Sequence, residues 1–204
     1  MLADASLREL LAAFASPDPT PGGGSASAVS AALGASLLVM VATLPKTRAG
    51  SDDDRAALAA AAATLGVVQL QLIEAIDLDA AAYDHVVAAY KLPKGTDAEQ
   101  AARKVAVERA LVGATDVPLA VMRLSAAALA QARAVAAHGH RAASSDVGVA
   151  AALLGAGFHG ARLNVAINLR GLKDAAYVEG VESEMVRLGG ASADATTAVE
   201  SLLR

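Results

Sequence analysis

The chain has 204 residues and a formal net charge of −4, and it is 55% hydrophobic but only 2% aromatic. This length fits a single domain, and the acidic balance argues against the basic face that nucleic-acid-binding proteins usually carry. The chain has no cysteine, which excludes disulfide bonds, a thiol nucleophile and thiolate metal ligands. Alanine supplies most of the hydrophobic content and is the best helix former, so we expect an all-α protein.

The N-terminal segment, residues 4–15, places its leucines and Phe14 on one side of a short amphipathic helix. No basic start followed by an apolar block is evident there, so we expect no secretory signal and a cytoplasmic protein. Residues 16–23 are dense in proline and glycine and are expected to form a loop.

The next predicted helix covers residues 25–44 and lies within a charge-free stretch, residues 20–44. That stretch is long enough to cross a bilayer, which leaves a membrane-embedded bundle as one alternative. It contains several serines and few large apolar side chains, however, and a helix that is apolar all round is typical of the centre of a soluble bundle. So much apolar helix also indicates an interface between subunits.

The remaining helices are separated by recognisable breaks. The basic, proline-containing segment 91–96 is one break, Pro118 preceded by Asp116 as a cap is the next, and Gly189-Gly190 is the last. The predicted helices are 52–90, 97–115, 118–137, 146–169, 173–187 and 191–203. Long helices joined by short breaks predict an up-and-down multi-helix bundle that forms one domain over residues 1–204.

The turn Pro21-Gly22-Gly23-Gly24-Ser25 is the most informative local feature. Free backbone amides at the start of a helix attract anionic or carbonyl groups, so this turn is a candidate ligand-binding corner. It is not a P-loop, because no Gly-Lys-Ser/Thr follows. The alternative is a tight corner that only lets two helices touch.

Two aspartates lie within an otherwise apolar helix, at positions 77 and 79. Residues two apart on a helix point about 200° away from each other, whereas Asp79 and Tyr83, four apart, share a face. An aspartate in an apolar stretch is costly to bury, and burial raises its pKa, so Asp77 and Asp79 are candidates for acid–base chemistry. A solvated stripe is the alternative.

Two asparagines, Asn164 and Asn168, share one face of a later helix that begins after Ser144-Ser145-Asp146. Paired amides can recognise the donor and acceptor edge of a heterocycle, or they can bond to each other across a helix interface. The serine–aspartate run is equally suited to capping the helix. The four histidines lack the spacing of a zinc-binding helix, so no metal site is expected.

Four segments of the chain, which follow one another in the same order as in the family, resemble the cyclodeaminase/cyclohydrolase family. That family contains the C-terminal domain of formiminotransferase-cyclodeaminase and the bacterial methenyltetrahydrofolate cyclohydrolases. The resemblance spans roughly residues 6–175, and one departure from the family pattern follows Leu44. The segments are Pro19-Thr20-Pro21-Gly22-Gly23-Gly24-Ser25, Asp77-x-Asp79-x-x-Ala82-Tyr83, Ser145-Asp146 and Asn164-Val165-x-Ile167-Asn168-Leu169.

The resemblance implies a dimeric, all-α enzyme that acts on C–N bonds of tetrahydrofolate derivatives. One reaction converts 5-formiminotetrahydrofolate to 5,10-methenyltetrahydrofolate and ammonia, and the other hydrolyses 5,10-methenyltetrahydrofolate to 10-formyltetrahydrofolate. It implies a folate substrate and a second copy of the chain as partner, with no metal or other cofactor. The charge and composition described above predict neither a nucleic-acid nor a membrane partner. The alternative is a non-catalytic folate-binding or assembly module with the same fold.

The resemblance also implies roles for individual residues. Asp77 or Asp79 would move the proton, with Tyr83 orienting the carboxyl group. Basic residues would meet the glutamate end of the substrate, with Lys46, Arg48, Lys91 and Lys94 as candidates. The other residues implied for substrate binding are Pro21, Gly22, Gly23, Gly24, Ser25, Asp146, Asn164 and Asn168.

Overall fold

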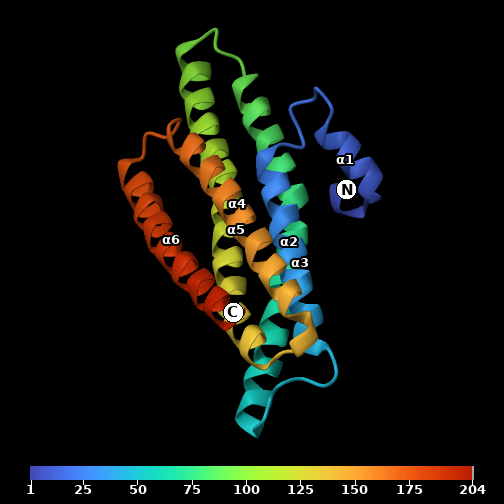
Figure 1. Ribbon diagram of the computed structural model, residues 1–204. Helices are drawn as coiled ribbons and strands as arrows, with labels where there is room; N and C mark the ends of the chain where they lie inside the picture. Colours follow the sequence, from blue (N-terminus) through green and yellow to red (C-terminus); the bar gives the residue numbers. More distant parts are fainter. Residues whose placement is uncertain (204) are drawn as a thin grey trace.

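The computed structural model describes residues 1–203, and within them it contains helices and no strands, as predicted (Figure 1). A one-turn 3-10 helix and a short α-helix form an N-terminal arm that precedes the long helices of the bundle. The elements are η1 (Leu2–Asp4), α1 (Leu7–Phe14), α2 (Gly23–Thr43), α3 (Asp52–Tyr90), α4 (Asp97–His138), η2 (Arg141–Ala143), α5 (Ser144–Leu169) and α6 (Ala175–Leu203).

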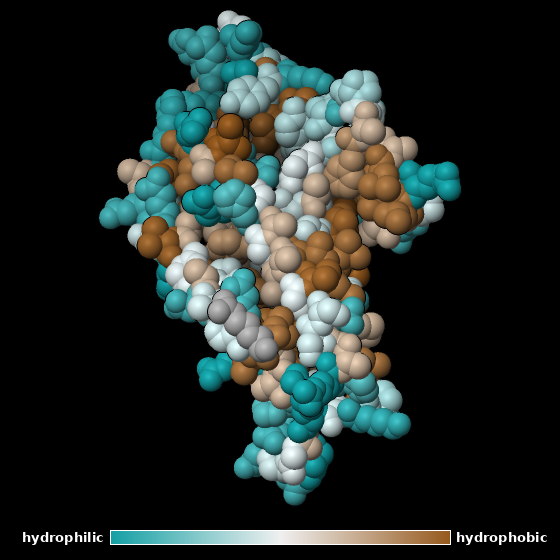
Figure 2. All heavy atoms as spheres, in the orientation of Figure 1, coloured by the Kyte–Doolittle hydropathy of each residue, from teal (hydrophilic) through white to brown (hydrophobic). Residues whose placement is uncertain are grey.

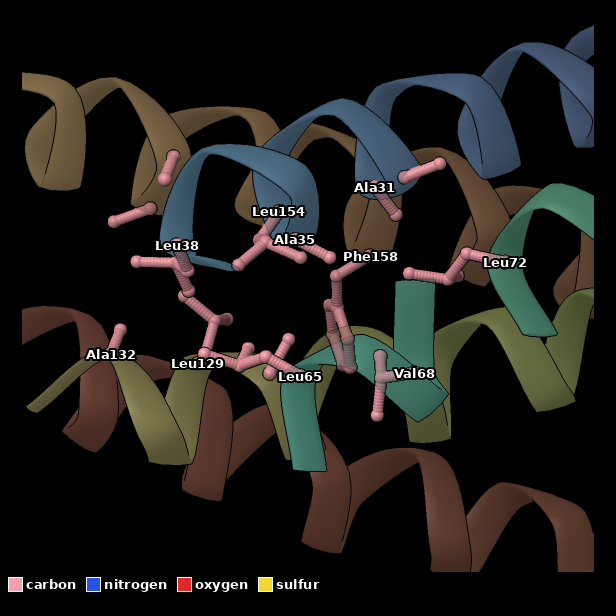
Figure 3. Close-up of a cluster of buried hydrophobic side chains, with 14 of the residues drawn as sticks. Ala31, Ala35, Leu38, Leu65, Val68, Leu72, Leu129, Ala132, Leu154 and Phe158 are labelled. Carbon is pink, nitrogen blue, oxygen red and sulfur yellow. The ribbon is translucent and has the colours of Figure 1, made fainter. Parts of the chain in front are cut away.

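Helix α2 packs against α3 and α5, while α4 packs against α3, α5 and α6. Figure 3 shows Leu38, Leu65 and Leu154, from three different helices, pointing into one core. The small residues of α2 allow close packing: a Cβ added at Gly157 of α5 would lie 2.7 Å from the carbonyl oxygen of Ser27 and 2.8 Å from Ala31 Cβ. The alanine- and glycine-rich composition of α2 is therefore explained by its central position.

Helix α4 runs without a break from Asp97 to His138, so the prediction of two helices separated at Pro118 was wrong. Proline has no N–H to donate to the carbonyl group four residues earlier, which here belongs to Ala114. The side-chain amide of Asn168, on α5, donates to that carbonyl oxygen at 2.7 Å. A hydrogen bond from a neighbouring helix thus satisfies the group that the proline leaves unpaired.

Helix α6 is also continuous, from Ala175 to Leu203, so the prediction of a break at Gly189-Gly190 was wrong. Glycine in a helix interior costs up to about 1 kcal/mol relative to alanine. Leu188 and Ser192, on either side of the glycines, are buried against the bundle. Tertiary packing along this helix therefore outweighs the local preference of the glycine pair.

Helices α2 and α3 are each long and apolar enough to cross a membrane by length and composition alone. Half of the most apolar window of α2 is buried inside the bundle. The core helix of a soluble protein passes the same test, so these two helices are weak evidence for a membrane span.

Candidate functional site

The glycine corner forms the start of α2, which begins at Gly23, two residues earlier than predicted. Gly22 is the N-cap residue and provides no side-chain cap for the helix. The peptide bond before Pro21 is cis. Gly23 and Gly24 therefore lie in the first turn of the helix, where backbone N–H groups have no partner within the helix.

The carboxylate of Asp79, on α3, caps this turn. Its Oδ2 accepts a hydrogen bond from the backbone N–H of Ser25 at 2.7 Å and lies 3.0 Å from Ser25 Oγ. The same hydroxyl group is 3.0 Å from the carbonyl oxygen of Ile76. A negative group is favourable at the positive end of a helix dipole. The structure thus brings the glycine corner and one predicted aspartate together, across 54 residues of sequence.

Burial raises the pKa of Asp79 above the ordinary aspartate value, although the hydrogen bonds from the Ser25 side chain and backbone act in the opposite direction. The carboxyl group therefore keeps its proton to a higher pH than an exposed aspartate does. A carboxyl group that can both accept and release a proton nearer to neutral pH is suited to general acid–base chemistry.

Gly24 allows Asp79 to approach this closely. A Cβ atom added at Gly24 would overlap the Asp79 carboxylate. At the exposed neighbour Gly23, an added Cβ would lie 3.5 Å from Asn164 Nδ2, an ordinary van der Waals distance. Asn164, on α5, is therefore the third member of the corner, and three helices contribute to it.

The two predicted asparagines do not act as a pair. Asn164 Nδ2 donates to the Gly160 carbonyl oxygen of its own helix at 2.9 Å, beside the glycine corner. Asn168 instead supports the Ala114 carbonyl group of α4. The structure thus gives Asn168 a packing role that the pattern of two amides on one face did not predict.

Asp77 points away from the corner, as the angle between residues two apart requires. Its Oδ1 accepts a hydrogen bond from the backbone N–H of Leu2 at 2.5 Å, and Oδ2 accepts one from Ala3 at 3.3 Å. Asp77 therefore holds η1 against α3. Tyr83, one turn beyond Asp79 on α3, is 43% exposed.

Two predicted substrate-binding residues lie at the opposite end of the bundle from the corner. Asp146 precedes Asn164 by 18 residues on α5, which is about 27 Å at 1.5 Å per residue. Lys46 follows the C-terminal end of α2, whereas the corner is at its N-terminal end. The nearby Arg48 donates to the carbonyl oxygens of Gly139 and Ala136 and so caps α4. These residues of the chain therefore do not join the corner.

Lys91 lies at the other end of the bundle, immediately after α3 and 12 residues beyond Asp79. The sequence analysis missed the basic residues that surround this region, Arg103, Lys104 and Lys173. They come from α4 and from the loop after α5, and no local motif connects them. Among residues 1–203 there is no group of three or more histidine, aspartate and glutamate side chains that could hold a metal ion.

Comparison with known proteins gives consistent results. A family model described as formiminotransferase-cyclodeaminase matches residues 6–187. A methenyltetrahydrofolate cyclohydrolase from Methylorubrum extorquens is 39% identical over 179 residues, which are 88% of this chain and 86% of that protein. A formimidoyltransferase-cyclodeaminase from Rattus norvegicus is 34% identical over 87% of this chain, which spans about a third of that protein (33%).

A solved structure has the same fold. The crystal structure of formiminotetrahydrofolate cyclodeaminase from Thermotoga maritima superposes with a TM-score of 0.87 at 26% identity. The match covers 100% of this chain and 98% of that one.

Proposed function

The chain belongs to the formiminotransferase-cyclodeaminase family, and we propose on this basis that it is a folate one-carbon enzyme acting on C–N bonds of tetrahydrofolate derivatives. Two reactions fit: hydrolysis of 5,10-methenyltetrahydrofolate to 10-formyltetrahydrofolate, and cyclodeamination of 5-formiminotetrahydrofolate. The cyclohydrolase relative is matched over 86% of its own length, so hydrolysis is the first reaction to test. Cyclodeamination is favoured by the fold shared with the Thermotoga maritima cyclodeaminase.

The observation that carries this proposal is the contact between Asp79 and the first turn of α2. In hydrolysis, a water oxygen attacks the methenyl carbon while Asp79 accepts a proton from that water. The resulting tetrahedral carbon bears both N5 and N10. Asp79 then returns the proton to N5 as the C–N5 bond breaks, and the hydroxyl proton leaves to solvent as the formyl C=O forms.

Cyclodeamination needs the same proton transfers. N10 attacks the formimino carbon, loses its proton, and the departing nitrogen receives a proton and leaves as ammonia. In both reactions we assign the holding of the folate ring to the glycine turn that starts at Pro21 and to the amide of Asn164. No step requires a metal or another cofactor, and the net negative charge argues against a nucleic-acid partner. We place the enzyme in the cytoplasm and not in a membrane.

Purified protein is expected to consume 5,10-methenyltetrahydrofolate faster than buffer does, with loss of the ultraviolet absorbance of the methenyl compound. If 5-formiminotetrahydrofolate is the substrate instead, the same absorbance appears, together with ammonia. A protein that retains the ligand without any change in absorbance would be the non-catalytic folate-binding module. That result with both compounds would overturn the proposed activity.

A homodimer is the second part of the proposal, and it rests on the outward surface of α2 and α5. Leu33 on α2 is 54% exposed, and Leu163 and Ile167 on the adjacent α5 are 55% and 60% exposed. Figure 2 shows hydrophobic residues gathered on the face of the molecule where the N-terminal arm and the α2–α5 region lie. We take these exposed apolar side chains on two neighbouring helices as part of a subunit interface, because large exposed apolar surfaces mark such sites.

The double variant Leu33→Glu/Leu163→Glu is expected to be monomeric, because four glutamates would be buried across a twofold interface. Analytical ultracentrifugation of the variant and of the wild-type protein measures this directly. The control is Val186→Glu on α6, which is 78% exposed and outside the proposed interface, and it should remain a dimer. A wild-type protein that is monomeric at all concentrations would contradict the proposal.

A further inference from the structure

A mainly apolar groove between α3 and α4 encloses a cavity of about 770 Å³. Leu78 and Val117 line one end of this α3–α4 groove, and Ala89 and Ala102 line the end near the turn that joins the two helices. Neither Asp79 nor any residue of the glycine corner lines it. Small-molecule sites typically have volumes of about 300–1,000 Å³ and mainly apolar walls. The groove therefore has the size and lining of a second ligand site.

The walls of the groove leave its space open. Leu78 is 47% exposed and Val105 is 70% exposed, so the chain leaves two large aliphatic side chains of the walls partly uncovered. Half of the lining residues are alanines, and a Cβ added at Gly113 would contact no neighbouring part of the chain within 4 Å. The proposed subunit interface lies on α2 and α5, the other two helices of the central bundle, so it does not cover the groove.

The two polar residues of the groove, His85 on α3 and Arg109 on α4, lie at about the same height. The two helices run in opposite directions (Figure 1). His85 follows Leu78 by seven residues and Arg109 precedes Val117 by eight, which correspond to rises of about 10.5 Å and about 12 Å. The other lining residues are apolar or glycine. The groove therefore carries its polar groups at one level, with apolar walls above and below them.

These two polar groups favour an anionic ligand. None of the ion pairs formed among residues 1–203 involves His85 or Arg109. The acidic residues nearby on α4, Glu108 and Asp116, accept hydrogen bonds from the loop after α5 and from the Tyr177 hydroxyl group. A guanidinium group is always charged and its N–H groups match the geometry of a carboxylate. A histidine ring nitrogen can donate a hydrogen bond to the same carboxylate.

The rest of the groove favours an aliphatic chain over an aromatic ring. No aromatic side chain lines the groove, so a ring would have no stacking partner there. The apolar wall extends along α4 for about 12 Å from Arg109 to Val117. An alkyl chain that lies along it would remove its own apolar surface and that of Leu78 from water, which is favourable.

We propose that the α3–α4 groove is a second ligand site and that it binds a single-chain aliphatic carboxylate. His85 and Arg109 hold the carboxylate, and the alkyl chain lies along the alanine-lined walls. The ligand contacts both α3 and α4 in the folded chain, so its binding stabilises the folded state and raises Tm. This inference goes beyond the proposed function and does not depend on it.

The test is titration calorimetry of the full chain with decanoate, at concentrations below those at which decanoate forms micelles. Decanoate is expected to bind at one site and to raise Tm. Arg109→Gln should weaken its binding at least about tenfold, because a hydrogen bond to a charged group is lost. Decanol lacks the carboxylate and butanoate lacks most of the chain, so each should bind at least about tenfold more weakly than decanoate.

Gly113→Leu tests the location of the site. The new side chain would fill the groove without displacing a neighbouring part of the chain, so the variant should fold and lose decanoate binding. Gly180→Leu is the matched control, because Gly180 is also an exposed helical glycine with open space around it, but it lies on α6 and outside the groove. This control should bind decanoate as the wild-type protein does. Leucine favours helix more than glycine, so both variants should be at least as stable as wild type without ligand.

Decanoate binding that persists in Gly113→Leu would place the ligand elsewhere on the molecule. Equal affinities for decanol and decanoate would remove the assigned role of His85 and Arg109. Each of these results overturns the inference, and so does equal loss of binding in the two glycine variants or absence of decanoate binding to the wild-type protein. Binding is measured here without turnover, so each of these results leaves the proposed function standing.

Discussion

Replacing Asp79 with asparagine is expected to lower kcat by at least about 100-fold, because general acid–base catalysis contributes at least that factor. Asparagine has nearly the same shape, and its Oδ1 can still accept the hydrogen bond that Ser25 donates from its backbone. The variant therefore tests proton transfer while the corner is preserved. Stopped-flow or steady-state absorbance of the methenyl compound gives kcat, and circular dichroism checks the fold.

Asp77→Asn is the matched comparison on the same helix. It removes the carboxylate that Leu2 and Ala3 bond to, and it leaves the contact between Asp79 and Ser25 in place. We expect kcat within a few-fold of wild type, with faster amide hydrogen exchange in η1. Equal turnover in the Asp79 variant and the wild type would eliminate the acid–base assignment, and a large loss only in the Asp77 variant would reverse it.

The Asp79 substitution also predicts a pH dependence of stability. Burial raises the pKa of Asp79 in the folded state above its unfolded value, so the folded state binds the proton more tightly. The resulting stabilisation is fully present below the unfolded pKa and is lost as the pH rises through the folded pKa. The asparagine variant has no such titration. Relative to wild type, its free energy of unfolding should therefore increase from acid to neutral pH, as urea denaturation at several pH values would measure.

Gly24→Ala is expected to cause the second largest loss. The added methyl group would overlap the Asp79 carboxylate, so either Asp79 or the first turn of α2 must move. Forcing an extra methyl group into a packed site typically costs 1–3 kcal/mol of stability. Displacement of the carboxyl group should also lower kcat about as far as the loss of Asp79 itself. Thermal unfolding and the absorbance assay measure the two effects separately.

The variant of the adjacent glycine, Gly23→Ala, should not lose stability. Its methyl group meets Asn164 at an ordinary distance, and alanine favours helix more than glycine does. We expect unchanged or slightly raised stability and an intact contact between Asp79 and Ser25. If both glycine variants lose stability equally, the effect of Gly24 comes from the backbone and not from the approach of Asp79.

The glycine corner and the two aspartates could be predicted from the sequence because their geometry is local. Residues two apart on a helix face different directions, which is why Asp79 lies at the corner while Asp77 holds the N-terminal arm. The sequence did not reveal which aspartate faces α2. That depends on the rotation of α3 in the bundle, which the whole core determines.

The errors arose where a distant contact overrides a local rule. Pro118 is a strong helix-breaking signal, and only the position of α5 shows that Asn168 compensates for it. The group of basic residues near Lys91 was missed for the same reason, since Arg103 and Lys173 are 70 residues apart and meet only in the folded chain. Lys46 was assigned to the substrate as a basic residue at a helix end, and Asp146 was assigned to it through the family resemblance. The lengths of α2 and α5 nevertheless place both residues at the far end of the bundle from the corner.

The hydrogen bond from Asn168 to the Ala114 carbonyl oxygen replaces the one that Pro118 cannot donate. The effects of substitutions at positions 118 and 168 are therefore coupled. A chain that loses the asparagine alone leaves the part-buried Ala114 carbonyl group without its donor, whereas a chain that first exchanges the proline regains a backbone N–H donor for it. After the proline is exchanged, the residue at position 168 no longer needs to be asparagine for this hydrogen bond. If relatives retain an asparagine at this position, the need to compensate for a proline on the neighbouring helix explains its retention. Its retention is then no evidence that the residue takes part in chemistry on a folate.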